Sequence, residues 1–514
     1  MRCLFRPVFG TILVGASILS AATTDPIHLD SGLVSGVPGT SDEVRVYKGI
    51  PFAAPPVGDL RWRAPQPATH WEGVRKADQF GPVCMQQARG PAASGPAPSE
   101  DCLYVNVWTA AKSGSERRPV IVWTYGGGFT GGSGSMAWYD GETLAKKGAV
   151  VVTYNYRLGV FGFLAHPELT KESPHHSSGN YGMMDMAAVL RWVQKNIANF
   201  GGDPRRVTIA GESAGSILVS AMVGSPEGKG LFQRAIGQSG AWMGININHM
   251  TTLATAEENG QKQAQGFGAA SVAELRAKSA DDLLKNGRGP FAIIVDGWYV
   301  PEDLSVTYAH HKENDVDLLV GSNHDEGTFF ARPGSTSAEQ FSGTAKRRFN
   351  DMADAYLKLY PASSDAEAAT SQLAGFRDEL GWHMRTWAQL QSARGKGKTY
   401  LYYFTHVPPT APGQPSRGAT HTAEISYMFN TPQANVTWTD TDRQLAKTMT
   451  SYWVNFAATG DPNGKGLPEW PTFKAKNGDK AMVLGDMVQA GPGIDPAMLS
   501  FYDSYYAKLT SGGL

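Results

Sequence analysis

The sequence has little net charge, few cysteines and, beyond its first residues, no long apolar run. Its 46 Lys and Arg balance 47 Asp and Glu, for a formal charge of −1, whereas nucleic-acid binding requires a strongly basic surface. No basic block or amphipathic stretch indicates binding to a membrane surface. Later segments fall short of about 18 uninterrupted apolar residues, so we expect no stable membrane insertion. From the balanced charge we expect no nucleic-acid partner.

The first 22 residues are typical of a signal peptide. Arg2 and Arg6 form a positive region, Val8–Leu19 is mostly apolar, and Ser20-Ala21-Ala22 offers a small-x-small cleavage site. We therefore expect Thr23 to begin the mature protein and the enzyme or binding module that follows to be exported, to the periplasm or outside the cell. An uncleaved anchor is the alternative.

Only three cysteines occur, and Cys3 would leave with the leader. The remaining pair, Cys84 and Cys102, would meet an oxidising compartment, which predicts a disulfide. It would close a loop rich in Gly, Ala and Pro and stabilise the fold by roughly 3 kcal/mol. Two separate buried thiols are the alternative.

Short apolar, β-branched runs alternate with glycine turns and helical patterns, which is typical of an α/β fold. Two charged, alanine-rich helical stretches, 251–286 and 338–395, look like insertions that cap one end of a sheet. No linker divides the chain, so we expect one domain over residues 23–514. Buried strands are predicted at 119–125, 149–154, 207–210, 317–320 and 399–404, and a helix at 183–197.

The pentapeptide Gly211-Glu212-Ser213-Ala214-Gly215 has the form G-x-S-x-G. It follows the strand VTIA and precedes a helical pattern over 216–223, the context of a nucleophile elbow, in which a strained turn exposes a serine. Flanking glycines allow the backbone to crowd there without Cβ clashes. The pattern predicts Ser213 as a nucleophile, and a purely structural turn is the alternative.

Three successive glycines, Gly126 to Gly128, directly follow the predicted strand 119–125. In isolation such a run is equally typical of a flexible loop. Beside an elbow it can supply backbone N–H groups, and Gly127 and Gly128 would form an oxyanion hole with Ala214. Each such donor is worth roughly 2.7–4 kcal/mol in a transition state.

A serine nucleophile needs a base, and the base needs an orienting carboxylate. In α/β-hydrolases the acid and then the histidine follow the serine along the chain. Two loops that follow predicted strands carry candidates. Spacing alone leaves Asp325 competing with Glu326, and His324 and His406 competing with His421.

With these motifs the chain resembles the type-B carboxylesterase/cholinesterase family of the α/β-hydrolase fold, most of all its bacterial, para-nitrobenzyl-esterase-like members. The resemblance begins near residue 29 and rests on YKGIPFAAPPVGDLRWRAPQP, SEDCLYVNVW, YGGGFTGGS, NYRLGVFGFL, GNYGMMDMAAVLRWVQKNIANFGGDP, VTIAGESAGS, GSNHDEGTFF and GATHTAEISYMF. It implies a large, mostly parallel central sheet flanked by helices with helical cap insertions. It also implies hydrolysis of small-molecule carboxylic esters.

The resemblance implies roles for particular residues. The family's acid is the glutamate of N-x-D-E-G, here Glu326, and its base is the histidine of G-x-x-H-x-x-E, here His421. It also implies a supporting polar cluster behind the serine, the Cys84–Cys102 disulfide and two structural ion pairs. The cluster would be Glu212, Ser239 and Glu424, and the ion pairs Arg61–Glu100 and Arg157–Asp185.

The chain departs from the family pattern at Thr422 and Ser216, where glycine is common, and neither change removes a catalytic group. The loop between the cysteines lacks the tryptophan with which cholinesterases hold a quaternary ammonium, which disfavours choline esters. The implied acyl-enzyme mechanism requires no metal and no organic cofactor. The pair His175-His176 has no carboxylate at ligand spacing and indicates a solvated loop.

Two other function classes remain open. An inert adhesion module on this fold would lack the serine, which is present here, and acyl transfer to amide or thioester substrates would use the same residues. A monomer is the simplest expectation. Aromatic side chains of the cap-like regions could line a substrate pocket or belong to the core: Trp242, Phe291, Trp298, Phe330 and Trp382.

Overall fold

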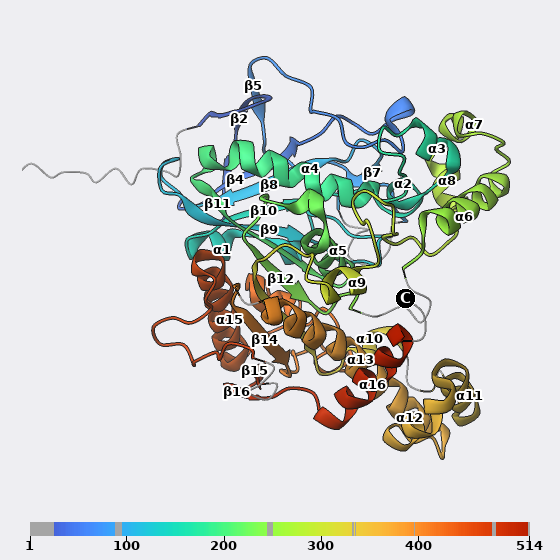
Figure 1. Ribbon diagram of the computed structural model, residues 1–514. Helices are drawn as coiled ribbons and strands as arrows, with labels where there is room; N and C mark the ends of the chain where they lie inside the picture. Colours follow the sequence, from blue (N-terminus) through green and yellow to red (C-terminus); the bar gives the residue numbers. More distant parts are fainter. Residues whose placement is uncertain are drawn as a thin grey trace, which may run out of the picture.

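The computed structural model describes residues 25–87, 95–243, 250–331, 334, 336–394, 396–474 and 480–511. The predicted signal peptide, residues 1–22, and Cys3 lie outside this part of the chain. Figure 1 shows a central twisted sheet with helices on both of its faces and further helical groups at one side.

The central sheet has 11 strands in the order β16-β15-β14-β13-β12-β11-β9-β10-β8-β4-β3. Pairing is parallel from β15 through to β10 and antiparallel at the two ends, so the sheet is mostly parallel, as expected. The strands are β3 (Val37–Pro38), β4 (Arg45–Pro51), β8 (Tyr104–Thr109), β9 (Arg118–Thr124), β10 (Val150–Tyr154), β11 (Gly202–Glu212), β12 (Arg234–Gln238), β13 (Asp317–Asn323), β14 (Thr399–Phe404), β15 (Lys480–Leu484) and β16 (Val488–Pro492).

Helices cover both faces of this sheet, so its inner strands are buried on both sides and need continuous apolar sequence. Strand β10 is buried at every residue, and β9 at all but its first. That is why the runs VVVTY and VIVWT were recognisable as strands. Smaller pieces pair outside the main sheet: β1 (Ile27–Leu29), β2 (Gly32–Ser35) and β5 (Val74–Lys76), and separately β6 (Val83–Cys84) with β7 (Pro98–Ser99).

The α-helices run from α1 to α16 along the chain. They are α1 (Glu142–Lys146), α2 (Gly159–Phe163), α3 (Pro167–Glu172), α4 (Tyr181–Asn196), α5 (Ala214–Gly224), α6 (Leu253–Gly266), α7 (Val272–Ala277), α8 (Ala280–Asn286), α9 (Leu304–Ala309), α10 (Gly327–Phe330), α11 (Ala338–Phe349), α12 (Ala353–Leu359), α13 (Asp365–Arg394), α14 (Ile425–Phe429), α15 (Asp440–Thr459) and α16 (Pro496–Ser511). Within the described residues, no helix combines the length and apolar character that crossing a bilayer would require.

The two predicted insertions are helical, but the second is only partly a cap. Helices α6–α8 and α11–α12 form separate groups in Figure 1, whereas the later turns of α13 pack on the sheet. Trp387 and Met384 of α13 are fully buried, and Gly240 N–H approaches the Met384 sulfur at 3.3 Å. From charge and alanine content, the sequence analysis assigned these turns to the cap. That assignment was wrong because a helix that covers a sheet needs only one apolar face.

Helices α11, α12, α13 and α16 share an aromatic core of their own, which the sequence analysis did not anticipate. Phe349 stacks on Tyr356 with ring centroids 4.2 Å apart, and Trp382 stacks on Tyr506 at 4.2 Å. The C-terminal helix therefore holds the outlying helical group against the rest of the fold.

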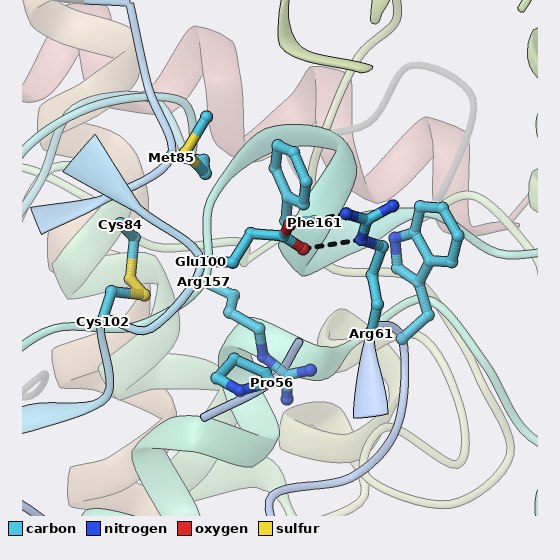
Figure 2. Close-up of a pocket in the computed structure, with 9 residues that line it drawn as sticks. Pro56, Arg61, Cys84, Met85, Glu100, Cys102, Arg157 and Phe161 are labelled. Carbon is cyan, nitrogen blue, oxygen red and sulfur yellow. Dashed lines mark hydrogen bonds and ion pairs between the residues drawn. A yellow bond between two sulfur atoms is a disulfide. The ribbon is translucent and has the colours of Figure 1, made fainter. Parts of the chain in front are cut away.

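A disulfide joins Cys84 to Cys102, with an S–S distance of 2.04 Å. Figure 2 shows the disulfide beside the ion pair between Arg61 and Glu100, in which Arg61 Nη2 lies 2.6 Å from Glu100 Oε2. The Arg61 guanidinium also donates to three carbonyls at the end of α7, those of Leu275, Arg276 and Lys278. This pair thus connects the disulfide-closed loop to a cap helix.

The second expected ion pair, between Arg157 and Asp185, is also present. Its N–O distance is 2.8 Å and both side chains are buried. The backbone N–H of Arg157 donates to the same carboxylate. Both pairs hold structural elements together, as expected from the resemblance.

Candidate active site

Ser213 lies on a sharp turn between β11 and α5. Its φ of 55° and ψ of −126° are strained for a residue with a side chain. The turn is so tight that a Cβ on Gly215 would lie 2.1 Å from the Thr124 carbonyl oxygen, and one on Gly211 2.6 Å from the carbonyl of Gly215. The glycines of the pentapeptide are therefore required by the backbone approach itself.

The glycine loop after β9 lies beside this serine. A Cβ on Gly126 would meet the Ser213 Cβ at 2.9 Å. Gly127 and Gly128 have φ values of 112° and 61°, which favour glycine. These three glycines and Ser213 line one cavity of 940 Å³, and the buried Ala214 begins α5 next to it.

Glu326, in the loop after β13, faces the imidazole of His421. Its Oε2 lies 2.6 Å from His421 Nδ1. Its Oε1 accepts from Ser239 Oγ at 2.6 Å and from the Asn323 N–H at 2.8 Å. The buried carboxylate is therefore held by three hydrogen bonds, which orient the ring of His421.

The competing residues are directed elsewhere. Asp325 accepts from the Ala419 N–H at 2.7 Å and contacts His324 Nδ1 at 3.0 Å. His406 lies between Asp442 and Asp486, at 2.8 and 2.6 Å. Of the alternatives left open by spacing, the structure brings Glu326 and His421 together.

The other imidazole nitrogen, Nε2 of His421, lies 3.0 Å from Glu212 Oε1. Within the described residues, no hydrogen bond reaches the Ser213 hydroxyl, although Ser213, Glu212 and His421 line the same cavity. Burial raises the pKa of Glu212 to about 8, against the effect of His421. Burial alone would lower the pKa of His421, but the carboxylates of Glu212 and Glu326 raise it to about 9.

Glu424 lies near Glu212 and His421 and is fully buried. It accepts from Gln238 Nε2 at 2.9 Å and from Asn323 Nδ2 at 2.5 Å, and burial raises its pKa. Gln238 in turn accepts from the indole N–H of Trp453. Sequence reasoning missed Gln238, which directly precedes Ser239, and Asn323, the first residue of the N-x-D-E-G motif.

The cavity wall is largely apolar, with Phe291, Phe329 and Phe330 among its lining residues. The Phe330 ring centroid lies 4.9 Å from that of His421. Among the described lining residues, the only cationic side chain other than that of His421 belongs to Arg288. Of the five aromatics that the sequence left open as pocket or core residues, Phe291 and Phe330 thus line this cavity.

The three tryptophans named with them are not among the described residues that line this cavity. Trp242 packs near Phe129, Trp298 stacks on His175 at 3.6 Å, and Trp382 belongs to the α16 core. No group of three or more His, Cys, Asp or Glu in the described part of the chain is arranged to hold a metal ion.

A model of the carboxylesterase family matches residues 24–491. The fumonisin B1 esterase of Sphingopyxis macrogoltabida is 40% identical over an alignment of 522 positions, which spans 94% of this chain and 92% of that protein. The para-nitrobenzyl esterase of Bacillus subtilis (strain 168) is 36% identical over 466 residues, with 86% and 91% covered.

A solved structure of a PNB esterase superposes with a TM-score of 0.81 at 32% identity and covers 94% of this chain and 99% of its own. This likeness, with the mixed sheet and its flanking helices, confirms the α/β-hydrolase fold. The chain therefore belongs to the type-B carboxylesterase family and is a carboxylesterase.

Proposed function

We propose that the chain hydrolyses carboxylic esters through an acyl-enzyme on Ser213. His421 takes the serine proton as the hydroxyl oxygen attacks the ester carbonyl, and Glu326 orients and stabilises the imidazolium that results. The N–H groups of Gly127, Gly128 and Ala214 stabilise the oxyanion. His421 then protonates the departing alcohol, and a water activated in the same way releases the acid.

The contact that supports this proposal most is the buried 2.6 Å hydrogen bond between Glu326 and His421 Nδ1, in a cavity shared with Ser213. It leaves Nε2 as the nitrogen that can accept a proton. Nε2 faces Glu212 Oε1 at 3.0 Å, so the serine hydroxyl must approach Nε2 for the proton transfer. Catalytic hydrogen bonds are often long before substrate is present. These side chains suffice for each proton transfer without a cofactor.

The decisive experiment replaces the nucleophile. Ser213→Ala should lower kcat by roughly 10⁴-fold or more while leaving thermal unfolding unchanged. An organophosphate should label the wild type with one equivalent at Ser213 and leave the variant unlabelled. Turnover near the wild-type rate in the variant would mean that another residue is the nucleophile, and an inert binding module would not be labelled.

The substrate class we propose is a small-molecule carboxylic ester. Fumonisin B1 and para-nitrobenzyl esters, which the names of two relatives mention, belong in the test panel with p-nitrophenyl and hydroxycinnamoyl esters of varied length. Matched ester and amide pairs decide between ester hydrolysis and transfer from amides. Faster cleavage of the amides would contradict the proposal.

We further propose that residues 23–514 form a single exported, monomeric domain, with cleavage after Ala22. The disulfide between Cys84 and Cys102 suits an oxidising compartment. Intact-mass measurement of the secreted protein should give a chain that begins at Thr23. Light scattering should give a mass close to that of one chain.

A further inference from the structure

Gln86 is a buried side chain that bonds to the glycine loop beside the proposed nucleophile. Its Nε2 donates to the carbonyl of Gly132 at 2.8 Å, and its Oε1 accepts from the N–H of the same residue at 2.9 Å. The Nε2 also donates to the Cys84 carbonyl at 3.1 Å. The side chain is 4% exposed, and it also lines the cavity that contains Ser213.

Gly132 lies close to the residues of the proposed oxyanion hole and lines the same cavity. The loop turns back on itself, because the N–H groups of Thr130 and Gly131 both point to the Gly127 carbonyl, at 3.1 and 3.2 Å. A Cβ on Gly127 would lie 2.2 Å from the Gly131 carbonyl oxygen, and one on Gly132 2.8 Å from the Gly126 carbonyl oxygen. The backbone of residues 131 and 132 therefore packs closely against that of Gly126 and Gly127.

A primary amide suits this position because it both donates and accepts. It pairs with the N–H and carbonyl of one residue, as a neighbouring strand would. A second buried amide acts farther along the loop: Asn155 accepts from the Gly134 N–H at 2.9 Å and donates to the Cys102 carbonyl at 3.1 Å. Each half of the disulfide is thus connected to the glycine loop by an amide side chain.

We propose that Gln86 is a positioning residue for the ester hydrolysis proposed above. Its amide connects the Cys84–Cys102 disulfide to the glycine loop and holds the N–H groups of Gly127 and Gly128 where the oxyanion forms. Figure 2 shows Met85, the residue between Cys84 and Gln86, beside the disulfide. The inference rests on the proposed function, since it concerns stabilisation of the tetrahedral intermediate.

The most direct variant is Gln86→Glu, which keeps the size of the side chain. A carboxylate can still accept from the Gly132 N–H but faces two carbonyl oxygens to which the amide donated. Gln86→Met removes both functions without adding charge. The matched control is Gln194→Glu, because Gln194 Nε2 also donates to two carbonyls, those of Pro204 and Leu231, at 2.8 Å each, away from the cavity.

Two kinetic constants and two inhibitors separate positioning from general damage. We expect Gln86→Glu to lower kcat by about 10- to 100-fold, because one oxyanion donor is worth about 10²- to 10³-fold, with KM within about threefold. In a trifluoromethyl ketone the carbonyl carbon is attacked by the Ser213 hydroxyl oxygen, and the adduct carries an oxyanion. This inhibitor should bind more weakly by a similar factor. The corresponding alcohol, which forms no oxyanion, should bind as it does to wild type. Gln194→Glu should leave all four quantities unchanged.

The inference would be overturned by wild-type kcat in Gln86→Glu, or by equal weakening of the ketone and the alcohol. If Gln86→Glu does not fold, Gln86→Met is judged by the same comparison of ketone and alcohol. Failure of the proposed function has a different signature. In that case the ketone would not inhibit the wild type and Ser213→Ala would remain active, which would overturn the role of Gln86 as well.

Discussion

Replacing Glu212 by glutamine should move the acidic limb of the kcat/KM profile to lower pH. Only a neutral imidazole can take the proton of Ser213, so the rate rises with pH as His421 loses its proton. The Glu212 carboxylate, 3.0 Å from Nε2, favours the protonated ring. Removing that charge lowers the pKa of His421, and the neutral form then appears at lower pH.

The distance sets the scale of this shift. Two unit charges 3.0 Å apart interact by about 5.5 kcal/mol at an effective dielectric constant of about 20, which corresponds to about four pH units. Because burial raises the pKa of Glu212 to about 8, its carboxyl carries full charge only above neutral pH. We therefore expect a shift of about one to two pH units.

The assay is the initial hydrolysis rate of a p-nitrophenyl ester between pH 5 and 10, corrected for spontaneous hydrolysis and read at a pH-independent wavelength. Asp325→Asn is the matched control, because Asp325 neighbours Glu326 but bonds to Ala419 and His324 instead of His421. Its profile should coincide with that of wild type. An unshifted limb in Glu212→Gln, with organophosphate labelling intact, would refute the reasoning.

Three further predictions follow from the same geometry. Glu326→Gln should lower kcat by about 10³- to 10⁴-fold, because an amide cannot stabilise the imidazolium; a loss below tenfold would argue against its role. Replacing Cys84 and Cys102 by serine should lower the free energy of unfolding by roughly 3 kcal/mol, measured by urea denaturation, and an unchanged midpoint would contradict this. Arg288→Ala should lower kcat/KM about tenfold for esters that carry a free carboxylate and leave neutral esters of equal size unaffected, because an exposed cation attracts anions over several ångströms. Equal losses for both kinds of ester would show that the charge of Arg288 is irrelevant.

Local sequence determined the parts of the site that depend on backbone geometry. The pentapeptide around Ser213 and the run Gly126 to Gly128 were recognisable because a strained turn and a close backbone approach tolerate little except glycine. The buried strands were recognisable because parallel strands covered on both faces must be continuously apolar. Family resemblance then selected Glu326 and His421, which spacing could not.

Tertiary structure decided everything that depends on which distant residues meet. Glu212 and His421, which are in contact, lie 209 positions apart in the sequence, and Gln86 and Gly132 lie 46 positions apart. The amino-acid composition does not indicate such pairings. The later turns of α13 looked like a cap because one face of that helix is polar, and only packing shows which neighbour its other face meets. Sequence specifies local conformation through sterics and burial pattern, whereas the protonation and alignment of a buried site depend on charges that the folded chain brings within a few ångströms.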